Sequence, residues 1–269
     1  MNKPKIFDCI TFFDENFLTN LRFEILDKVV DYFIVCESKY DHKGDPKPIN
    51  FSLKNNRFKN KVRHIIVEEQ FPDLSSGWLA ESYQREKISK GLYDAKNEDY
   101  ILFSDSDEIP NPKILENFYL KKKYAIFLQK IYVYKINVFN KYETPWEGTR
   151  ACKKKFLKSF THLRRKIEKR NTTKPFWSFK YEKSVELINE GGWHFNNLYS
   201  VETIKKKIET FPHSEFHSDK YTNIKNIKKR IDNLEDLYGR GHKYEKVSLD
   251  GSYPDYILEN IKLFEDYIL

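Results

Sequence analysis

Residues 101–110 read Ile-Leu-Phe-Ser-Asp-Ser-Asp-Glu-Ile-Pro, an apolar run that ends abruptly in three carboxylates and is stopped by a proline. The run is typical of a buried strand, and carboxylates crowded at a strand end often hold a hard cation. Asp105 and Asp107 are two positions apart, so in an extended segment they leave on one face and repel unless a divalent cation lies between them. The alternative is an acidic turn in which Asp107 or Glu108 caps the next helix. We expect Glu108 to orient the turn or cap that helix rather than bind the cation.

Outward from this stretch, the first third of the sequence alternates strand-like and helix-like patterns. We expect strands over Lys5–Phe13, Tyr32–Glu37, Val62–Val67 and Tyr100–Phe103, and helices over Phe17–Val30 and Trp78–Tyr93. This alternation predicts βαβα units, and therefore an α/β fold with a largely parallel sheet. Ligands bind such sheets beyond the carboxyl ends of the strands, where Glu37 and Asp105 both lie.

The first expected helix has a one-sided apolar pattern. Its apolar face is formed by Leu18, Leu21, Ile25, Leu26 and Val29. Arg22 and Glu24 lie off that face, so the pattern predicts that both point away from the core.

The pattern changes after Pro112. A helix is followed by strands over Tyr124–Leu128 and Ile131–Asn137, a basic tract from Lys153 to Lys183, a strand and turn over Glu186–Phe195, and helices over Val201–Thr210, Tyr221–Leu237 and Tyr256–Ile268. The length suits one domain, and we expect a single domain over residues 1–269 with a basic insertion at about 150–183.

The sequence is basic, with a formal net charge of +8 and a pI near 9.0. This balance suits nucleic acid, a phosphate-bearing substrate or an anionic membrane surface. The abundance of Lys, Asn, Ile, Phe and Tyr is equally what an AT-rich genome produces without selection for any ligand. The basic tract has two interpretations as well: it contacts acceptor phosphates or an anionic surface, or it is a solvated insertion.

No targeting or membrane-spanning segment is evident. The N-terminal segment is soon interrupted by carboxylates, so it lacks the apolar core of a signal peptide. No window is apolar over the length that spans a bilayer. Cys9, Cys36 and Cys152 are an odd number without metal-ligand spacing, which favours reduced core thiols in a cytosolic protein.

A second unusual cluster covers residues 191–195, which read Gly-Gly-Trp-His-Phe. Paired glycines let a backbone come close to a ligand and place an imidazole beside it. His194 could complete a metal site begun by two aspartates, or it could be a buried strand histidine. Downstream, one of Lys205–Lys207 could neutralise a phosphate, although such lysines are also ordinary helix surface.

Trp78, Glu81, Gln84 and Arg85 fall on one side of the second expected helix, at spacings of three and four. Arg85 could bind a diphosphate with its forked guanidinium, or it could pair structurally with Glu81. The four tryptophans could likewise offer faces to sugar rings or belong to the core.

Six motifs occur along the chain in a fixed order. They are Leu21–Glu24, Val35–Ser38, Gly44–Pro48, Gly77–Trp78 with Arg85, Asp105–Pro110 and Gly192–His194. In this order they resemble glycosyltransferase family 17, whose best-known members are the bisecting β-1,4-mannosyl-glycoprotein 4-β-N-acetylglucosaminyltransferases. The resemblance runs through nearly all of the chain.

The resemblance implies a GT-A type fold, which is a Rossmann-like αβα sandwich with a mainly parallel central sheet, followed here by C-terminal helices. It also implies a nucleotide-sugar-binding half, residues 1–110, and an acceptor-side half, residues 111–269.

The resemblance further implies that Asp105 and Asp107 form a DxD motif that holds Mn²⁺ or Mg²⁺ against the diphosphate of a nucleotide sugar. His194 is implied as a third metal ligand or a diphosphate contact. Lys207 and Arg85 are implied as phosphate partners of the donor.

An inverting transfer, which the family is expected to perform, needs a carboxylate that takes the proton of the acceptor hydroxyl. Glu147 and Glu190 are candidates by chain order. Glu37 matches a family motif, and it would also face the nucleoside or sugar of the donor. Trp146 and Trp193 are candidates for contacts with the acceptor.

We therefore expect a soluble, metal-dependent glycosyltransferase that moves N-acetylglucosamine from UDP-N-acetylglucosamine onto a glycan, a glycolipid or a surface polysaccharide. The animal members of the family are Golgi proteins with a membrane anchor. No anchor is evident here, so we expect a cytoplasmic enzyme with at most peripheral contact at the inner face of a membrane. The sequence does not indicate the oligomeric state.

Two other functions compete with this expectation. A metal-dependent sugar nucleotidyltransferase would use the same aspartates, but it normally has a glycine-rich phosphate loop near its N-terminus, and residues 7–16 contain no glycine. A basic nucleic-acid-binding module would suit the charge, but glycine-rich and aromatic RNA-binding signatures are absent from the sequence, so we expect no nucleic-acid partner.

Overall fold

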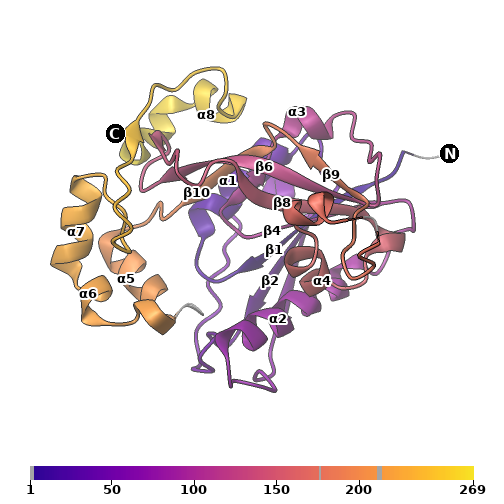
Figure 1. Cartoon of the computed structure of the whole chain (residues 1–269), viewed down its shortest axis with the longest axis horizontal. Helices are drawn as coiled ribbons and strands as arrows, with labels where there is room; N and C mark the ends of the chain where they lie inside the picture. The colour runs from indigo at the N-terminus through magenta and orange to yellow at the C-terminus, as the bar shows by residue number, and fades with distance from the viewer. Residues whose placement is uncertain (1–2, 176, 211–213) are drawn as a thin grey trace.

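The structure, a computed structural model, describes residues 3–175, 177–210 and 214–269 (Figure 1). Its strands are β1 (Ile6–Phe12), β2 (Tyr32–Ser38), β3 (Val62–Val67), β4 (Tyr100–Ser104), β5 (Glu108–Pro110), β6 (Tyr124–Val133), β7 (Val138–Phe139), β8 (Trp146–Lys153), β9 (Val185–Ile188), β10 (Gly192–Asn196) and β11 (Glu245–Lys246). Its α-helices are α1 (Asn16–Leu26), α2 (Gly77–Lys87), α3 (Pro112–Leu115), α4 (Phe160–Arg165), α5 (Val201–Thr210), α6 (Asp219–Thr222), α7 (Ile224–Asp232) and α8 (Asp255–Glu259).

The first half of the sheet is parallel. Its strands lie in the order β3-β2-β1-β4, and the pairs β1–β2, β1–β4 and β2–β3 all run in the same direction. The four strands and two helices expected from the alternating pattern are confirmed, with ends that shift by a few residues. The carboxyl ends of β1, β2 and β4 consequently meet at one edge of the sheet.

The second half of the sheet is mixed, which corrects the expectation of a mainly parallel sheet. β8 is antiparallel to both β4 and β6, whereas β9 and β10 are parallel to β6, and β5 is antiparallel to β10. Buried central strands are apolar along their whole length whichever way they run, so the apolar pattern carries no information on their direction.

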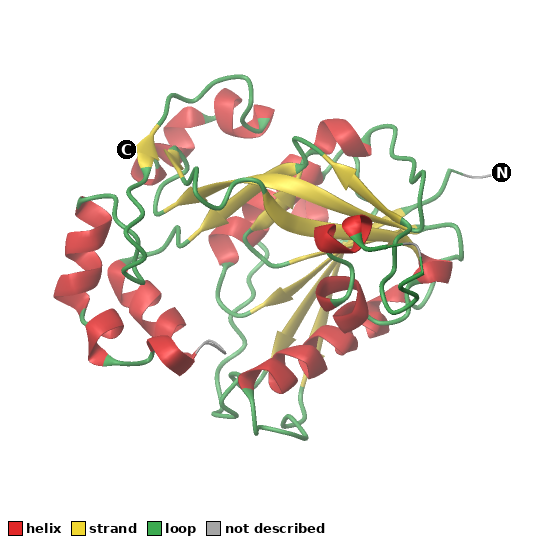
Figure 2. Ribbon diagram, viewed as in Figure 1, coloured by secondary structure: helices red, strands yellow, loops and turns green. Residues whose placement is uncertain are grey.

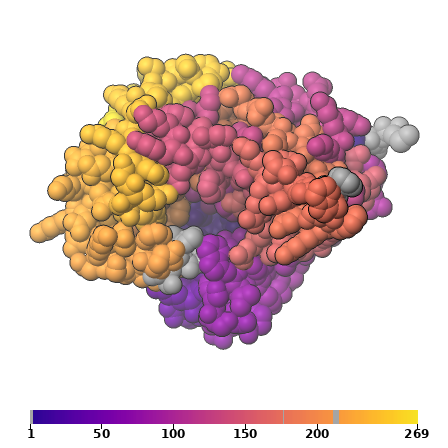
Figure 3. Space-filling view, viewed as in Figure 1, coloured from indigo at the N-terminus to yellow at the C-terminus, as the bar shows by residue number. Residues whose placement is uncertain are grey.

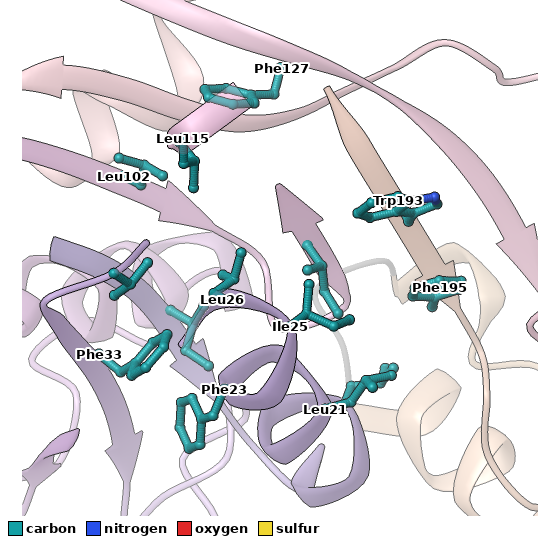
Figure 4. Close-up of a cluster of buried hydrophobic side chains, with 14 of the residues drawn as sticks. Leu21, Phe23, Ile25, Leu26, Phe33, Leu102, Leu115, Phe127, Trp193 and Phe195 are labelled. Atoms are coloured by element: carbon teal, nitrogen blue, oxygen red, sulfur yellow. The ribbon is translucent and has the colours of Figure 1, made fainter. Parts of the chain in front are cut away.

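Helices cover both faces of the sheet, as the expected αβα sandwich requires (Figure 2). On one face, α1, α3 and α8 pack on a core that includes Phe33, Leu102 and Phe127 (Figure 4). On the other face, α4 and the 3₁₀ turn after α2 pack on Phe7, Cys9 and other strand residues of opposite parity. Alternate side chains of each strand thus serve different cores.

Arg22 of α1 is fully buried, although the helical pattern placed it off the core. Its guanidinium is paired with the carboxylate of Asp8 on β1. It also donates to the hydroxyl of Ser104 at 2.9 Å and to the carbonyl of Glu108. One side chain therefore links α1, β1, the end of β4 and the start of β5.

β10 lies between β5 and β6 and pairs with both strands. Gly192 has a φ of +132°, a conformation that L side chains rarely adopt. A Cβ atom at Gly191 would lie 2.7 Å from the backbone nitrogen of Leu128, and one at Gly192 would collide with the carbonyl oxygen of Ile109. The paired glycines thus let the chain pass between β5 and β6.

The C-terminal helices are shorter than expected. The expected helix over Tyr221–Leu237 is divided into α6 and α7, and the one over Tyr256–Ile268 into α8 and a 3₁₀ helix, Ile261–Tyr267. α5 and α7 pack together through Ile204, Ile208 and Ile227. None of the helices in the described ranges combines the length and apolarity that crossing a bilayer requires.

All three cysteines are buried, as expected for core thiols. Burial raises the pKa of the thiol of Cys36 and of Cys152 to about 12, and it raises the pKa of Cys9 well above its usual range.

The buried ion pair gives a test of the fold. Arg22→Met removes the guanidinium but keeps an apolar side chain of similar length, so the charge of Asp8 is left buried without a partner. We expect the free energy of unfolding in urea to fall by about 3–5 kcal/mol. Arg57→Met is the matched control, because it removes an exposed partner of Glu24 on the same helix and should cost no more than about 1 kcal/mol. Equal losses in the two variants would contradict the structural role of Arg22.

Candidate active site

A cleft of about 1390 Å³ opens at the edge where β1 and β4 end. Its floor is formed by residues 11–13 at the carboxyl end of β1 and by the turn 105–107 after β4. One wall comes from α2, α4 and the amino end of β8, and the other from β10 and α5. Figure 3 shows the surface hollowed between the purple segment around α2, the orange-red segment around α4 and the lighter orange C-terminal helices.

Glu108 organises the turn on the floor of the cleft. Its buried carboxylate accepts hydrogen bonds from the backbone N–H of Asp105 at 3.1 Å and from the indole N–H of Trp146 at 2.7 Å. It also lies 3.0 Å from the guanidinium of Arg164. The expectation that Glu108 orients the turn is confirmed, whereas the following helix is capped by Asn111.

The two aspartates of the turn are held by opposite walls. Asp105 is paired with Arg164 of α4. The carboxylate of Asp107 lies 3.4 Å from the imidazole of His194 on β10 and 3.4 Å from the ammonium group of Lys207 on α5. Each carboxylate therefore has its own cationic partner from a segment distant in sequence.

Mutual charge stabilisation dominates this arrangement. Burial alone would raise the pKa of Asp107, but the charges of His194 and Lys207 hold it well below its usual range. Burial would likewise lower the pKa of His194, but Asp107 raises it. Arg164 is buried too, and the carboxylates of Asp105 and Glu108 raise its pKa. For Glu108 burial prevails, and its pKa is raised despite Arg164.

The two carboxylates of the turn suit a cation that takes only two ligands from the protein. In the described ranges, no group of three or more His, Cys, Asp or Glu side chains is arranged to hold a metal ion. His194 turns its Nε2 atom toward Asp107 as a salt-bridge partner. Asp105 and Asp107 nevertheless both line the cleft, and Mg²⁺ is commonly bound through one or two carboxylates, with waters and phosphate oxygens as its other ligands.

Arg85 lines the wall formed by α2 and is only 2% exposed. One of its terminal nitrogens pairs with Glu81 at 2.9 Å, so the structural pairing considered from the sequence is present. Its Nε and Nη1 atoms are buried without a hydrogen-bond partner among the described residues. Buried polar groups are nearly always satisfied, so these two N–H groups suit an anionic ligand of the cleft.

Glu147 and Trp146, at the amino end of β8, line the cleft as the sequence suggested for a base and an acceptor contact. Glu147 is about one-third exposed. One of its oxygens accepts the backbone N–H of Lys169 at 2.8 Å. Of the three candidate bases, the cleft brings in only Glu147.

Glu37 lies outside the cleft lining, although it is at the carboxyl end of the expected strand. Its fully buried carboxylate accepts from the ammonium group of Lys47 at 2.8 Å and from the backbone N–H groups of Asn50 and Phe51 at 2.6 and 3.1 Å. It also lies 3.1 Å from His64. Burial opposes ionisation, yet these partners lower the pKa of Glu37. This carboxylate holds the loop after β2 instead of facing a donor.

Glu190 and Trp193 are also outside the cleft. Glu190 precedes β10, is largely exposed and pairs with Lys130 at 3.0 Å. Trp193 points into the core beside α1, and its indole N–H donates to the carbonyl of Ser252 at 2.9 Å (Figure 4). Strand alternation places Trp193 and His194 on opposite faces of β10, so only His194 reaches the cleft.

Sequence reasoning did not single out several charged residues of the cleft, among them Glu15 and Arg164. Burial raises the pKa of Glu15, which follows β1 much as Asp105 follows β4. Because β1 and β4 are neighbours in the parallel part of the sheet, a search for carboxylates after every strand would have found it. Arg164 is one of many cations in the basic tract, and no sequence signal separates it from the others.

Comparison with known proteins places this geometry in context. The profile described as Glycosyltransferase family 17 matches residues 1–244. The beta-1,4-mannosyl-glycoprotein 4-beta-N-acetylglucosaminyltransferases of Rattus norvegicus and Homo sapiens are 31% identical over 116 residues and 33% identical over 103 residues. These matches cover 39% and 35% of this chain, but only 22% and 19% of the relatives' own length.

Solved structures with a partial likeness include glucosyl-3-phosphoglycerate synthase from Mycobacterium tuberculosis. Its complex with Mn²⁺, uridine-diphosphate and glucosyl-3-phosphoglycerate is 12% identical, with 71% of each chain covered and a TM-score of 0.38. Its complex with Mn²⁺, uridine-diphosphate and phosphoglyceric acid is 11% identical, with 95% of this chain and 91% of that chain covered and a TM-score of 0.37.

The pair formed by Asp107 and His194 gives a pH-dependent stability. Because the pKa of His194 is raised in the folded protein, its pairing with Asp107 stabilises the fold fully below the ordinary histidine pKa. This contribution to the free energy of unfolding is lost as the pH rises through the raised pKa. The unfolding free energy lost in Asp107→Asn should therefore be larger at about pH 6 than at about pH 9, by on the order of 1 kcal/mol. Urea titrations at both pH values measure this difference. An equal loss at the two pH values would show that Lys207 alone stabilises the carboxylate.

Proposed function

This chain belongs to glycosyltransferase family 17, and from that membership and the cleft we propose that it transfers a sugar from a nucleotide-activated donor to a hydroxyl group of a glycan. The single observation that carries the proposal is the floor of the cleft. Two neighbouring carboxylates, Asp105 and Asp107, lie there between cations of two opposite walls.

The diphosphate of the donor is proposed to lie over this turn. Lys207 is on one side and places a positive charge near Asp107, and His194 adds a second one when it is protonated. Arg85 is on the other side, with two N–H groups that lack a partner among the described residues. These groups would stabilise the negative charge that grows on the diphosphate when the bond to the sugar breaks. UDP-N-acetylglucosamine is the donor we propose, because the named relatives are N-acetylglucosaminyltransferases.

We propose that Asp105 and Asp107 hold a divalent cation, Mn²⁺ or Mg²⁺, when the donor is bound. The bound ion would supply positive charge for the leaving diphosphate. Arg164 is paired with Asp105 and Lys207 with Asp107, so both carboxylates are held at the floor of the cleft.

Glu147 is the proposed base of an inverting transfer. It lies in the cleft, keeps about one-third of its side chain exposed, and has one oxygen fixed by the backbone N–H of Lys169. The remaining oxygen can take the proton of an acceptor hydroxyl as that oxygen attacks the anomeric carbon. The bond from the anomeric carbon to the diphosphate breaks in the same step, and the diphosphate leaves with the electron pair.

Trp146 is the proposed contact for the sugar ring of the acceptor. It neighbours Glu147 in sequence and lines the same cleft. Its indole N–H is bound to Glu108, and its ring centroid lies 5.2 Å from that of His194, so its orientation is fixed from two sides. A glycan or glycolipid presented on this ring would bring a hydroxyl group to Glu147.

Calorimetry tests donor binding directly. We expect UDP-N-acetylglucosamine to bind in the presence of Mn²⁺ and to lose at least about tenfold in affinity when the ion is chelated. Asp107→Asn should abolish this metal dependence while the circular dichroism spectrum stays unchanged. GDP-sugars serve as the comparison for the nucleotide. If wild type binds no nucleotide sugar with or without the ion, the proposed function is wrong.

A matched pair of variants tests the base. Glu147→Gln keeps the hydrogen bond to Lys169 but cannot take a proton, so kcat should fall by about 10²- to 10⁴-fold while donor affinity is retained. Glu190→Gln, outside the cleft, should leave kcat within about twofold. Turnover with UDP-N-acetylglucosamine and a β-mannosyl glycan acceptor measures both. A fully active Glu147→Gln enzyme would remove Glu147 from the mechanism.

A further inference from the structure

The basic tract carries an exposed aromatic tip that the proposed chemistry does not use. Phe179 is 94% exposed, more than any other large apolar side chain among the described residues, and Trp177 is 65% exposed. Both lie in the loop between the 3₁₀ helix Lys169–Thr173 and β9. Backbone hydrogen bonds from Ser178 to Pro175 at 3.0 Å and from Phe179 to Trp177 at 3.1 Å fold this loop into a compact turn. Single exposed apolar residues are common, but two large aromatics at one turn suggest a contact surface.

The segment that carries this tip is rich in positive charge. Five cationic side chains of the same segment are exposed, and none of them forms an ion pair with a described residue: Lys158, Arg165, Lys166, Lys169 and Lys180. The segment 158–183 holds only two carboxylates, Glu168 and Glu182, and Glu168 is already paired with Arg170. We call Trp177, Phe179 and these five cations the basic-aromatic surface.

We propose that the basic-aromatic surface binds the face of an anionic lipid bilayer. Aromatic side chains insert at the level of the lipid headgroups, and lysines and arginines around them are attracted to the negative surface charge. A protein without a membrane-crossing helix in its described ranges can bind a bilayer in this way, through a few inserted side chains and a ring of cations.

The basic-aromatic surface belongs to the same segment as one wall of the cleft. The same segment forms part of the cleft wall through Arg164, Arg165, Lys166 and Arg170. A bilayer on the basic-aromatic surface would therefore lie beside the wall that carries the proposed acceptor site. If the proposed function holds, the acceptor is a glycan attached to a lipid of that bilayer. The bilayer contact itself does not depend on the proposed function.

α7 also presents a basic face and does not meet the same description. It exposes Lys225, Lys228 and Lys229, but its Ile227 is buried against α5. Its exposed apolar side chain is Ile224, at 42%, and it presents no exposed aromatic residue. α7 therefore supplies a control for charge without an inserting tip.

The test is flotation of the purified full chain with lipid vesicles. Vesicles of phosphatidylcholine with phosphatidylglycerol should carry the protein upward in a density gradient, whereas vesicles of phosphatidylcholine alone should not. Binding should weaken by about tenfold or more when salt is raised from about 0.1 M to about 0.5 M, because the charges are screened.

Two variants locate the surface. The double variant Trp177→Ala/Phe179→Ala should lower partitioning into anionic vesicles by at least about tenfold, because the inserted apolar area is lost. Lys169→Gln/Lys180→Gln should lower it about fivefold or more. The matched controls are Tyr119→Ala, an exposed aromatic outside the segment, and Lys225→Gln/Lys228→Gln on α7, which removes the same charge. Both controls should stay within about twofold of wild type.

The outcomes separate this inference from the proposed function. Wild type that does not float with anionic vesicles would overturn the bilayer contact, whatever its donor binding. An α7 control that loses as much binding as Lys169→Gln/Lys180→Gln, with an unaffected aromatic variant, would also overturn it, because the attraction would then be general. Calorimetric donor binding by Trp177→Ala/Phe179→Ala should match wild type, since neither residue lines the cleft.

Discussion

The buried guanidinium of Arg22 is the constraint on which the floor of the cleft depends. It binds Asp8 in the middle of β1, the hydroxyl of Ser104 and the carbonyl of Glu108. Ser104 and Glu108 are the two residues that flank the turn 105–107. Both ends of that turn are thus bound to one side chain, which is itself held by α1. A buried charge is costly unless it is fully paired, and here the guanidinium makes two hydrogen bonds to Asp8 and two to the residues that flank the turn.

The cleft above that floor balances its charges locally. Asp105 is paired with α4, which lies about sixty residues further along the chain, and Asp107 with α5, about one hundred residues further along. The net charge of +8 is consequently a poor guide to the cleft, where acidic and basic side chains alternate. Exposed cations of the basic tract without an ion-pair partner among the described residues include Arg165 and Lys166, which line the cleft wall, and Lys158, Lys169 and Lys180, which do not. The overall charge therefore does not describe the charge of the cleft.

The sequence predicts the parallel part of the fold well, because β1, β2, β3 and β4 are short apolar runs separated by helical patterns. The family resemblance also brings Asp105, Asp107 and His194 together, and all three line the cleft. The rule that ligands bind beyond the carboxyl ends of strands does not predict the position of the Glu37 side chain, because a strand-end carboxylate can turn toward a ligand or toward its own loop. In this structure the backbone N–H groups of Asn50 and Phe51 bind the carboxylate, and no pattern in the sequence predicts these hydrogen bonds. Periodicity fails for Arg22 in the same way, since it assigns charged side chains to solvent and cannot recognise a buried partner on another strand.

The three cysteines have a practical consequence for spectroscopy. All of them are buried, and burial keeps their thiols protonated at neutral pH, so none offers a reactive thiolate to an alkylating dye. A single cysteine introduced by Phe179→Cys or Tyr119→Cys would therefore be labelled selectively in the natural background. One fluorophore or spin label could report on the aromatic tip while a second, placed in a separate variant, reports on the surface around Tyr119.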